Sequence, residues 1–92
     1  MMQRSVSAAF VLAWVMWLNA QGQWSAGQAY EGKGECDSQV PVVRDRMVNG
    51  YKNLDWRAWA GDTPNSIELR HVSGSQRKNV FLVCYPSEFT PK

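Results

Sequence analysis

The sequence contains one histidine, two cysteines and no motif that specifies a reaction or a ligand. It has no serine elbow, and the Gly-Lys-Gly triplet at positions 32–34 lacks the additional glycines and the Lys-Ser/Thr pair of a phosphate-binding loop. One histidine and two cysteines cannot fill the four positions of a structural zinc site without distant carboxylates. We therefore expect neither a cofactor nor a metal, and we favour a protein that is not an enzyme.

The chain also lacks an excess of charge of one sign. Ten lysines and arginines are balanced by eight acidic residues, which gives a net charge of +2 over 92 residues. Because the two signs are interspersed, there is no electrostatic basis for binding nucleic acid or acidic lipid. We expect no nucleic-acid partner.

A long hydrophobic run is missing as well. The apolar run at residues 6–18 is shorter than the roughly 20 residues that a transmembrane helix needs. Arg4 precedes the run, and small residues at Ala20 and Gly22 allow cleavage after Gly22, with a later candidate after Ala29. This pattern predicts an export segment at residues 1–22, a domain at residues 23–92, and a periplasmic or extracellular protein. If residues 1–22 stay uncleaved, the alternative is a membrane-anchored accessory peptide.

A second interpretation divides the same run. Trp, Val and Trp favour a pleated surface, so residues 13–18 could be the first β-strand of the folded domain. Residues 19–23 would then form a hairpin turn, with Trp24 on the return strand. A continuous apolar run suits either interpretation, so periodicity does not decide between them.

The best helix candidate is residues 37–54. Its apolar residues recur at spacings of three and four, which places them on one face: Val40, Val43, Met47, Tyr51 and Leu54. Pro41 is tolerated there if Ser38 is the N-cap, because the first N–H groups of a helix have no helical partner. Asn49-Gly50 is a weak point at which the helix could end early.

Two strands are predicted after the helix. Residues 66–72 alternate, so Ile67, Leu69 and His71 face one way and the residues between them the other. Residues 80–85 are apolar on both sides and predict a strand in the middle of the sheet, buried on both faces and ended by Pro86. We expect a loop at residues 55–65 and a loose tail at residues 87–92. The fold class is α+β: one helix packed on a small, mainly antiparallel sheet, with a single disulfide.

The cysteines and two other segments carry a resemblance. In a small exported domain two cysteines predict a disulfide, whereas two buried thiols would suit a cytosolic protein. The Trp-Val-Met-Trp segment, Glu35-Cys36 at the start of a helix, and Phe-Leu-Val-Cys-Tyr-Pro at residues 81–86 resemble a group of small exported bacterial proteins of unknown function. The resemblance implies that residues 14–18 are a retained strand and that Cys36 bonds Cys84. It implies no activity.

Two sets of side chains are candidates for function. His71 lies close in sequence to Glu68 and Arg70, as in the general acid/base sets of small ribonucleases, but an alternating strand points His71 away from the other two. Trp56 and Trp59 flank Arg57 and would form a binding surface if exposed, although they could instead cover the core, which we weigh more heavily. We expect an exported, non-enzymatic binding module that contacts a protein or an envelope component. The alternative is a small secreted, ribonuclease-like hydrolase that uses His71 and Glu68.

Overall fold

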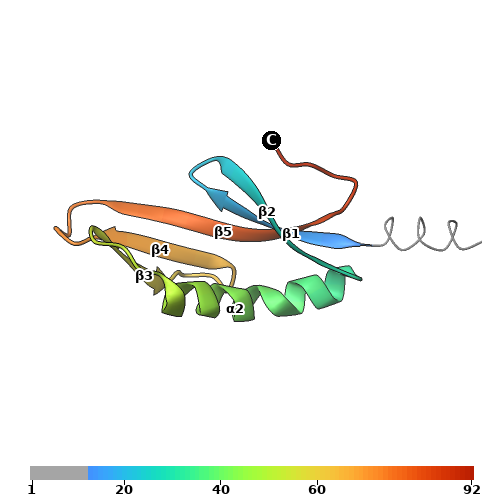
Figure 1. Cartoon of the computed structure of the whole chain (residues 1–92), viewed down its shortest axis with the longest axis horizontal. Coiled ribbons are helices and arrows are strands. Elements are labelled where there is room, and N and C mark those ends of the chain that lie inside the picture. Colours follow the sequence, from blue (N-terminus) through green and yellow to red (C-terminus); the bar gives the residue numbers. More distant parts are fainter. Residues whose placement is uncertain (1–12) are drawn as a thin grey trace, which may run out of the picture.

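A computed structural model describes residues 13–92 as one helix and a five-stranded sheet (Figure 1). The elements are β1 Trp14–Ala20, β2 Gln23–Tyr30, α2 Lys33–Gly50, β3 Trp56–Ala60, β4 Ser66–His71 and β5 Arg77–Pro86. All neighbouring strands are antiparallel, in the order β2-β1-β5-β4-β3. The α+β prediction is therefore confirmed. Residues 1–12, which carry most of the predicted export signal, lie outside the described residues.

The strand interpretation of residues 13–18 is confirmed, since β1 spans Trp14–Ala20 and pairs with both β2 and β5. A two-residue turn, Gln21-Gly22, joins β1 to β2, and both turn residues have positive φ, at 58° and 86°. Such turns match the right-handed twist of the flanking strands. The Gly22 N–H donates to the Asn19 side-chain oxygen at 2.8 Å. Cleavage after Gly22 would therefore remove an interior strand of this sheet.

Helix α2 begins four residues earlier than predicted. Gly32 is its N-cap, and the Glu35 carboxylate accepts a hydrogen bond from the Glu31 N–H, which helps to fix the first turn. The prediction of Ser38 as N-cap is wrong, because its hydroxyl lies inside the helix and donates to the Glu35 carbonyl. Pro41 is consequently an interior proline, where it lacks the N–H that would bond the carbonyl four residues earlier.

The helix ends at Gly50, as the weak Asn49-Gly50 pair suggested. Tyr51 and Leu54, which the periodic pattern placed on the helix, lie beyond it. Leu54 is 91% exposed, so its apolar side chain has no place in the core. The predicted helix is too long because helical spacing alone does not distinguish an apolar residue in the helix from one in the loop that follows.

The core lies between α2 and one face of the sheet. Its buried members are Met16, Cys36, Val40 and Leu82, and Ile67 and Val80 are buried further along the sheet. The prediction that β5 is central is confirmed, but burial on both of its faces is wrong. Val80 and Leu82 face the helix, whereas Phe81 on the opposite face is 41% exposed. Within residues 13–92, the one helix packs on one face of the sheet.

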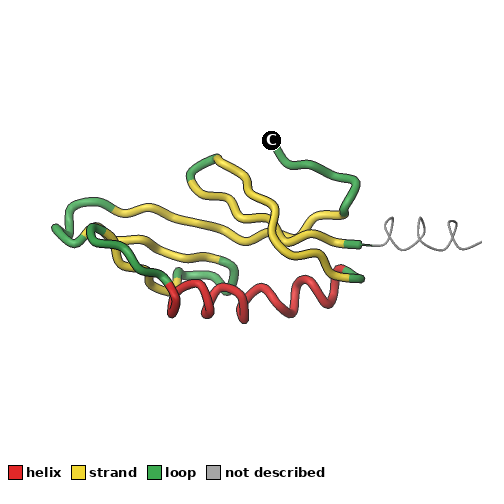
Figure 2. The backbone as a smooth tube through the Cα atoms, viewed as in Figure 1, coloured by secondary structure: helices red, strands yellow, loops and turns green. Residues whose placement is uncertain are grey.

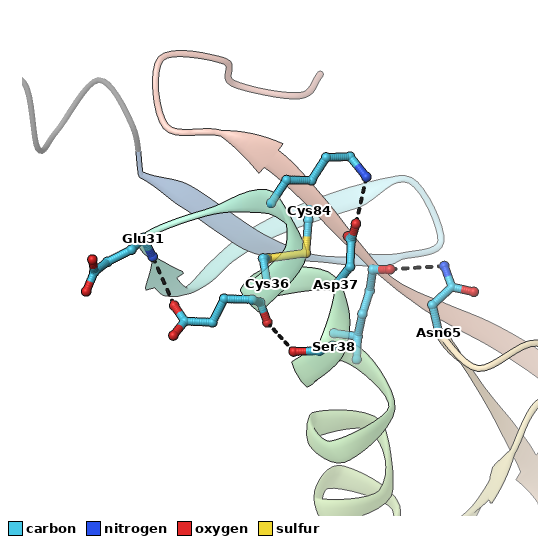
Figure 3. The surroundings of a disulfide bond; sticks show 9 residues. Glu31, Cys36, Asp37, Ser38, Asn65 and Cys84 are labelled. Atoms are coloured by element: carbon cyan, nitrogen blue, oxygen red, sulfur yellow. Dashed lines mark hydrogen bonds and ion pairs between the residues drawn. A yellow bond between two sulfur atoms is a disulfide. The ribbon is translucent and has the colours of Figure 1, made fainter.

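The disulfide between Cys36 and Cys84 is present (Figure 3), as the cysteine count and the resemblance implied. The two Cα atoms are 6.2 Å apart, within the usual range for a bridge. Cys36 lies in the first turns of α2 and is fully buried, while Cys84 lies on β5. The bond therefore joins the start of the helix to the central strand of the sheet.

The C-terminal segment is not the loose tail that was predicted. It turns back across the sheet on the side opposite α2, where it is drawn as a loop (Figure 2). The Phe89 ring lies 4.6 Å from the Tyr85 ring, and the Phe89 N–H donates to the Pro86 carbonyl. Pro91 is buried. These contacts hold the segment in place, and no periodic pattern in the sequence predicts them.

Candidate functional site

The predicted binding residues lie on β3, at one edge of the sheet. Residues 55–65 were expected to be a loop, but Trp56–Ala60 form a strand that pairs with β4, with Trp56 opposite His71 and Trp59 opposite Glu68. Because side chains alternate along a strand, Trp56 and Trp59 point to opposite faces of the sheet. The structure therefore does not bring the two tryptophans together on one surface. They border the same edge from both sides.

Trp56 lies on the face that also carries α2. The His71 ring meets it edge-on with a centroid separation of 5.1 Å, and the Lys78 ammonium lies 4.4 Å from its centroid. The ring is half-buried. These contacts give Trp56 a structural role in packing β3 onto β4 and β5, in agreement with the core interpretation.

Trp59 lies on the opposite face and is 51% exposed. The Arg70 guanidinium lies 4.9 Å from the ring centroid, a cation–π contact across the β3–β4 pair. No helix covers this face in the described part of the chain, as Figure 1 shows. Trp59 is therefore a large aromatic side chain that is held in one orientation while half of it meets solvent.

A charged network continues from Trp59 across the same face. The Glu68 carboxylate accepts a hydrogen bond from Arg70 Nε at 2.8 Å and lies 3.3 Å from Arg77 Nη1. The hydrogen bond from Arg70 is the main reason that the pKa of Glu68 lies below its ordinary value, and the charges of Arg70 and Arg77 add to the effect, while partial desolvation opposes it. Two arginines share one carboxylate, so the network keeps a positive charge.

Arg57 makes its hydrogen bonds within its own segment of the chain. Its guanidinium turns back and donates to the Asn53 carbonyl at 3.0 Å and to the Trp56 carbonyl at 3.3 Å. Beside it lies an open hollow of about 610 Å³, whose walls include Trp56 and the exposed Leu54. Sequence reasoning missed Leu54 as a surface residue because its spacing fitted the helix.

A second missed feature is the pair of cations that lie over the tryptophan rings. Arg70 on β4 and Lys78 on β5 lie over the rings of Trp59 and Trp56, and only strand register brings them there. The sequence offered a signal in the alternation of residues 66–72, which predicted that Arg70 shares a face with Glu68. It offered no signal that Trp59 would lie on the same face, because the pattern of residues 55–65 predicts a loop. We name Leu54, Trp56, Arg57, Trp59 and Arg70, which border this edge of the sheet from both of its faces, the β3 surface.

His71 and Glu68 do not converge. Glu68 lies with Arg70 on the sheet face opposite α2, whereas His71 lies beside Trp56 on the face that carries α2. The His71 Nδ1 atom is 2.8 Å from the Ser73 hydroxyl, so its nearest polar partner belongs to the following turn. The residues named for the hydrolase alternative thus lie on opposite sides of the sheet.

Within residues 13–92, no group of three or more His, Cys, Asp or Glu side chains is placed to hold a metal ion. No helix in this part of the chain is long and apolar enough to cross a bilayer. Comparison with protein families, with curated proteins and with solved structures finds no match for the chain.

Proposed function

We propose that this chain is an exported, non-enzymatic binding module and that the β3 surface contacts an acidic segment of another protein. The observation that carries the proposal is Trp59, which is 51% exposed and fixed by the Arg70 guanidinium. Tryptophan and arginine are the residues that most often dominate binding energy at protein interfaces. A half-exposed tryptophan held in one orientation loses little conformational entropy when a partner covers it.

The apolar part of the surface supports the same proposal. A domain of this size has few large apolar side chains, yet Leu54 is 91% exposed and Trp59 is half exposed at one end of the sheet. Leu54 also lines the hollow of about 610 Å³ beside Trp56. Exposed apolar side chains that gather at one end of a small domain, next to a hollow, are typical of an interaction site.

The charge of the surface favours an acidic partner. Arg70 lies over the Trp59 ring, and Lys78 lies over the Trp56 ring on the opposite face of the sheet. Among residues 13–92, Glu68 is the carboxylate that pairs with Arg70 and Arg77. An acidic segment would complement these cations, and opposite charges favour encounter and orientation at interfaces. A partner of this kind is a protein segment that combines carboxylates with at least one apolar side chain for Leu54.

Affinity capture from the exported fraction of the producing cells tests the proposal. The disulfide-bonded wild-type protein, Trp59→Ala and Val42→Ala are immobilised side by side; Val42 is 46% exposed on α2 and serves as the control. We expect one partner with an acidic segment to be retained by wild type and Val42→Ala and lost with Trp59→Ala. Equal capture by all three proteins contradicts the assignment of the surface. A measured turnover activity without any captured partner contradicts the binding module itself.

The hydrolase alternative has a test of its own. Its residues, His71 and Glu68, point to opposite faces of the same strand, so a shared general acid/base role would require β4 to lose its strand conformation. We expect no ribonuclease activity from the purified protein. Activity that is present in wild type and lost in His71→Ala would favour the hydrolase over the binding module.

A further inference from the structure

A second concave site lies at the other end of the sheet, between α2 and the β1–β2 hairpin. It is a cleft of about 330 Å³ that is lined by side chains from three directions. Met16, Leu18 and Leu82 form its apolar floor on the sheet, and Val43 and Met47 form one wall on α2. This site shares no residue with the β3 surface, so its argument does not rest on the proposed function.

The cleft exists because β2 supplies almost no side-chain volume there. Ser25, Ala26 and Gly27 form the wall opposite the helix. Gly27 cannot be replaced by a larger residue without movement, since a Cβ atom at that position would lie 2.7 Å from the Met16 carbonyl oxygen. The chain is irregular at this point, where the β1–β2 register shifts between Val15 and Trp17. The bulge and the small side chains leave an apolar space that α2 does not fill.

One cation borders this apolar space. The Arg46 side chain lines the cleft, and no carboxylate is among the lining residues. Its guanidinium makes no hydrogen bond or ion pair with any of residues 13–92, in contrast to Arg44, which pairs with Asp45 and donates to the Thr63 carbonyl. Arg46 is therefore available to an anionic group that enters from solvent, while the interior of the cleft accepts an apolar chain.

We propose that this cleft binds a free medium-chain carboxylate, with the alkyl chain between α2 and β2 and the carboxylate on Arg46. The volume fits a ligand of about ten heavy atoms, because a water-sized group occupies about 30 Å³. Ligand sites in proteins are mostly apolar with a few polar groups that fix orientation, and the guanidinium matches a carboxylate in a two-bond geometry. Decanoate is the probe of this class.

The experiment titrates the full chain with decanoate, decanol and decyltrimethylammonium, and follows amide NMR shifts and heat. We expect decanoate to bind best, with shifts centred on Ser25, Val43 and Met47. Arg46→Gln should weaken decanoate binding about threefold to tenfold, to the level of decanol, because an exposed charged contact contributes about 1 kcal/mol. Ser25→Leu should abolish binding of both compounds by filling the cleft.

Lys33→Gln is the matched control, since Lys33 is an exposed cation on the same helix that already pairs with Asp37. It should bind decanoate as wild type does, and unfolding midpoints should confirm that every variant is folded. The proposal is overturned if decanoate and decanol bind equally, if Arg46→Gln is unchanged, or if decanoate does not bind. It is also overturned if the shifts at the cleft arise from dimerisation detected by sedimentation, or if binding is seen only with vesicles.

Discussion

The two ends of the sheet are built differently. At the end where α2 begins, a disulfide joins helix and sheet (Figure 3), and the side chains of Met16, Val40 and Leu82 are buried between them. At the β3 end, Leu54 is 91% exposed and Trp59 is 51% exposed, and much of the contact is made by cations that lie over aromatic rings. The difference indicates that stability is concentrated at the disulfide end, whereas the β3 end offers side chains to a partner.

The largest expected effect comes from removing β1 from the disulfide end. Deletion of residues 1–22 removes an interior strand that carries the buried Met16, so the fragment should not fold cooperatively. Urea unfolding followed by circular dichroism measures this. Deletion of residues 1–12, which keeps every described strand, is the comparison variant. A 23–92 fragment that unfolds in one sharp transition would mean that β1 is dispensable and would favour cleavage after Gly22.

Loss of the disulfide comes next. The bridge joins residues that are 48 positions apart, and the chain-entropy model gives about 4 kcal/mol for such a loop. This is comparable to the entire net stability of a domain of this size. The Cys36→Ala, Cys84→Ala double variant should therefore be largely unfolded at 37 °C in thermal melts. Labelling of both cysteines by an alkylating agent in the native protein would instead show that the bond is absent.

A pair of neighbours on β5 tests the separation of the two sheet faces. Leu82→Ala should lower the free energy of unfolding by about 2–5 kcal/mol, because Leu82 is 4% exposed and the change leaves a cavity. Phe81→Ala should cost less than about 1 kcal/mol, since Phe81 is 41% exposed on the other face. Urea denaturation of both variants measures the difference. Equal losses of stability would show that the sheet face opposite α2 contributes as much to the fold as the buried core does.

A smaller effect on stability is expected at the β3 end. Trp59→Ala removes an exposed ring and one cation–π contact, so it should lower the free energy of unfolding by about 1 kcal/mol or less. The same urea series measures it, with Trp56→Ala as the companion variant. Trp56 is half-buried between His71 and Lys78, and its loss should cost more than that of Trp59. The reverse order would mean that Trp59 is the structural tryptophan.

The smallest effect is expected for the contribution of Glu68 to stability and its dependence on pH. Its pKa is lower in the folded protein than in the unfolded chain, so its pairing with Arg70 stabilises the fold above the unfolded pKa, and this contribution is lost as the pH falls through the folded value. The stability difference between wild type and Glu68→Gln should therefore shrink on acidification. Urea midpoints at several pH values from neutral to acidic measure it. A difference that is independent of pH would show that the ion pairs contribute nothing.

Much of the fold could be predicted from local patterns. The Trp-rich strand β1, the alternation of β4 and the apolar run of β5 ended by Pro86 each carry their signal in adjacent residues. The cysteine count and the resemblance predicted the disulfide. The helix was found but displaced, because its start depends on Gly32 and Glu35, which do not belong to the apolar stripe.

The sequence predicted which residues belong to the candidate site, but not how those residues are arranged in space. Trp56, Arg57 and Trp59 were named, yet their division between two faces depends on β3 being a strand, and five residues with two alanines carry a weak strand signal. Arg70 and Lys78 reach the tryptophans through pairing between strands, which no single stretch of sequence encodes. The Phe89–Tyr85 contact in the C-terminal segment was missed for a different reason: it depends on the turn that follows Pro86, which no periodic pattern predicts.

Site-specific photo-crosslinking tests the role of the β3 end most directly. A photoreactive phenylalanine replaces Trp59 in one variant and Val42 on the exposed side of α2 in another, and each is irradiated in the exported fraction of the producing cells. We predict crosslinks from position 59 to a segment of one protein that contains several Asp or Glu residues, and none from position 42. Crosslinks from position 42 alone, or equal crosslinks from both positions to many unrelated proteins, would contradict the assignment of the β3 surface as the contact site.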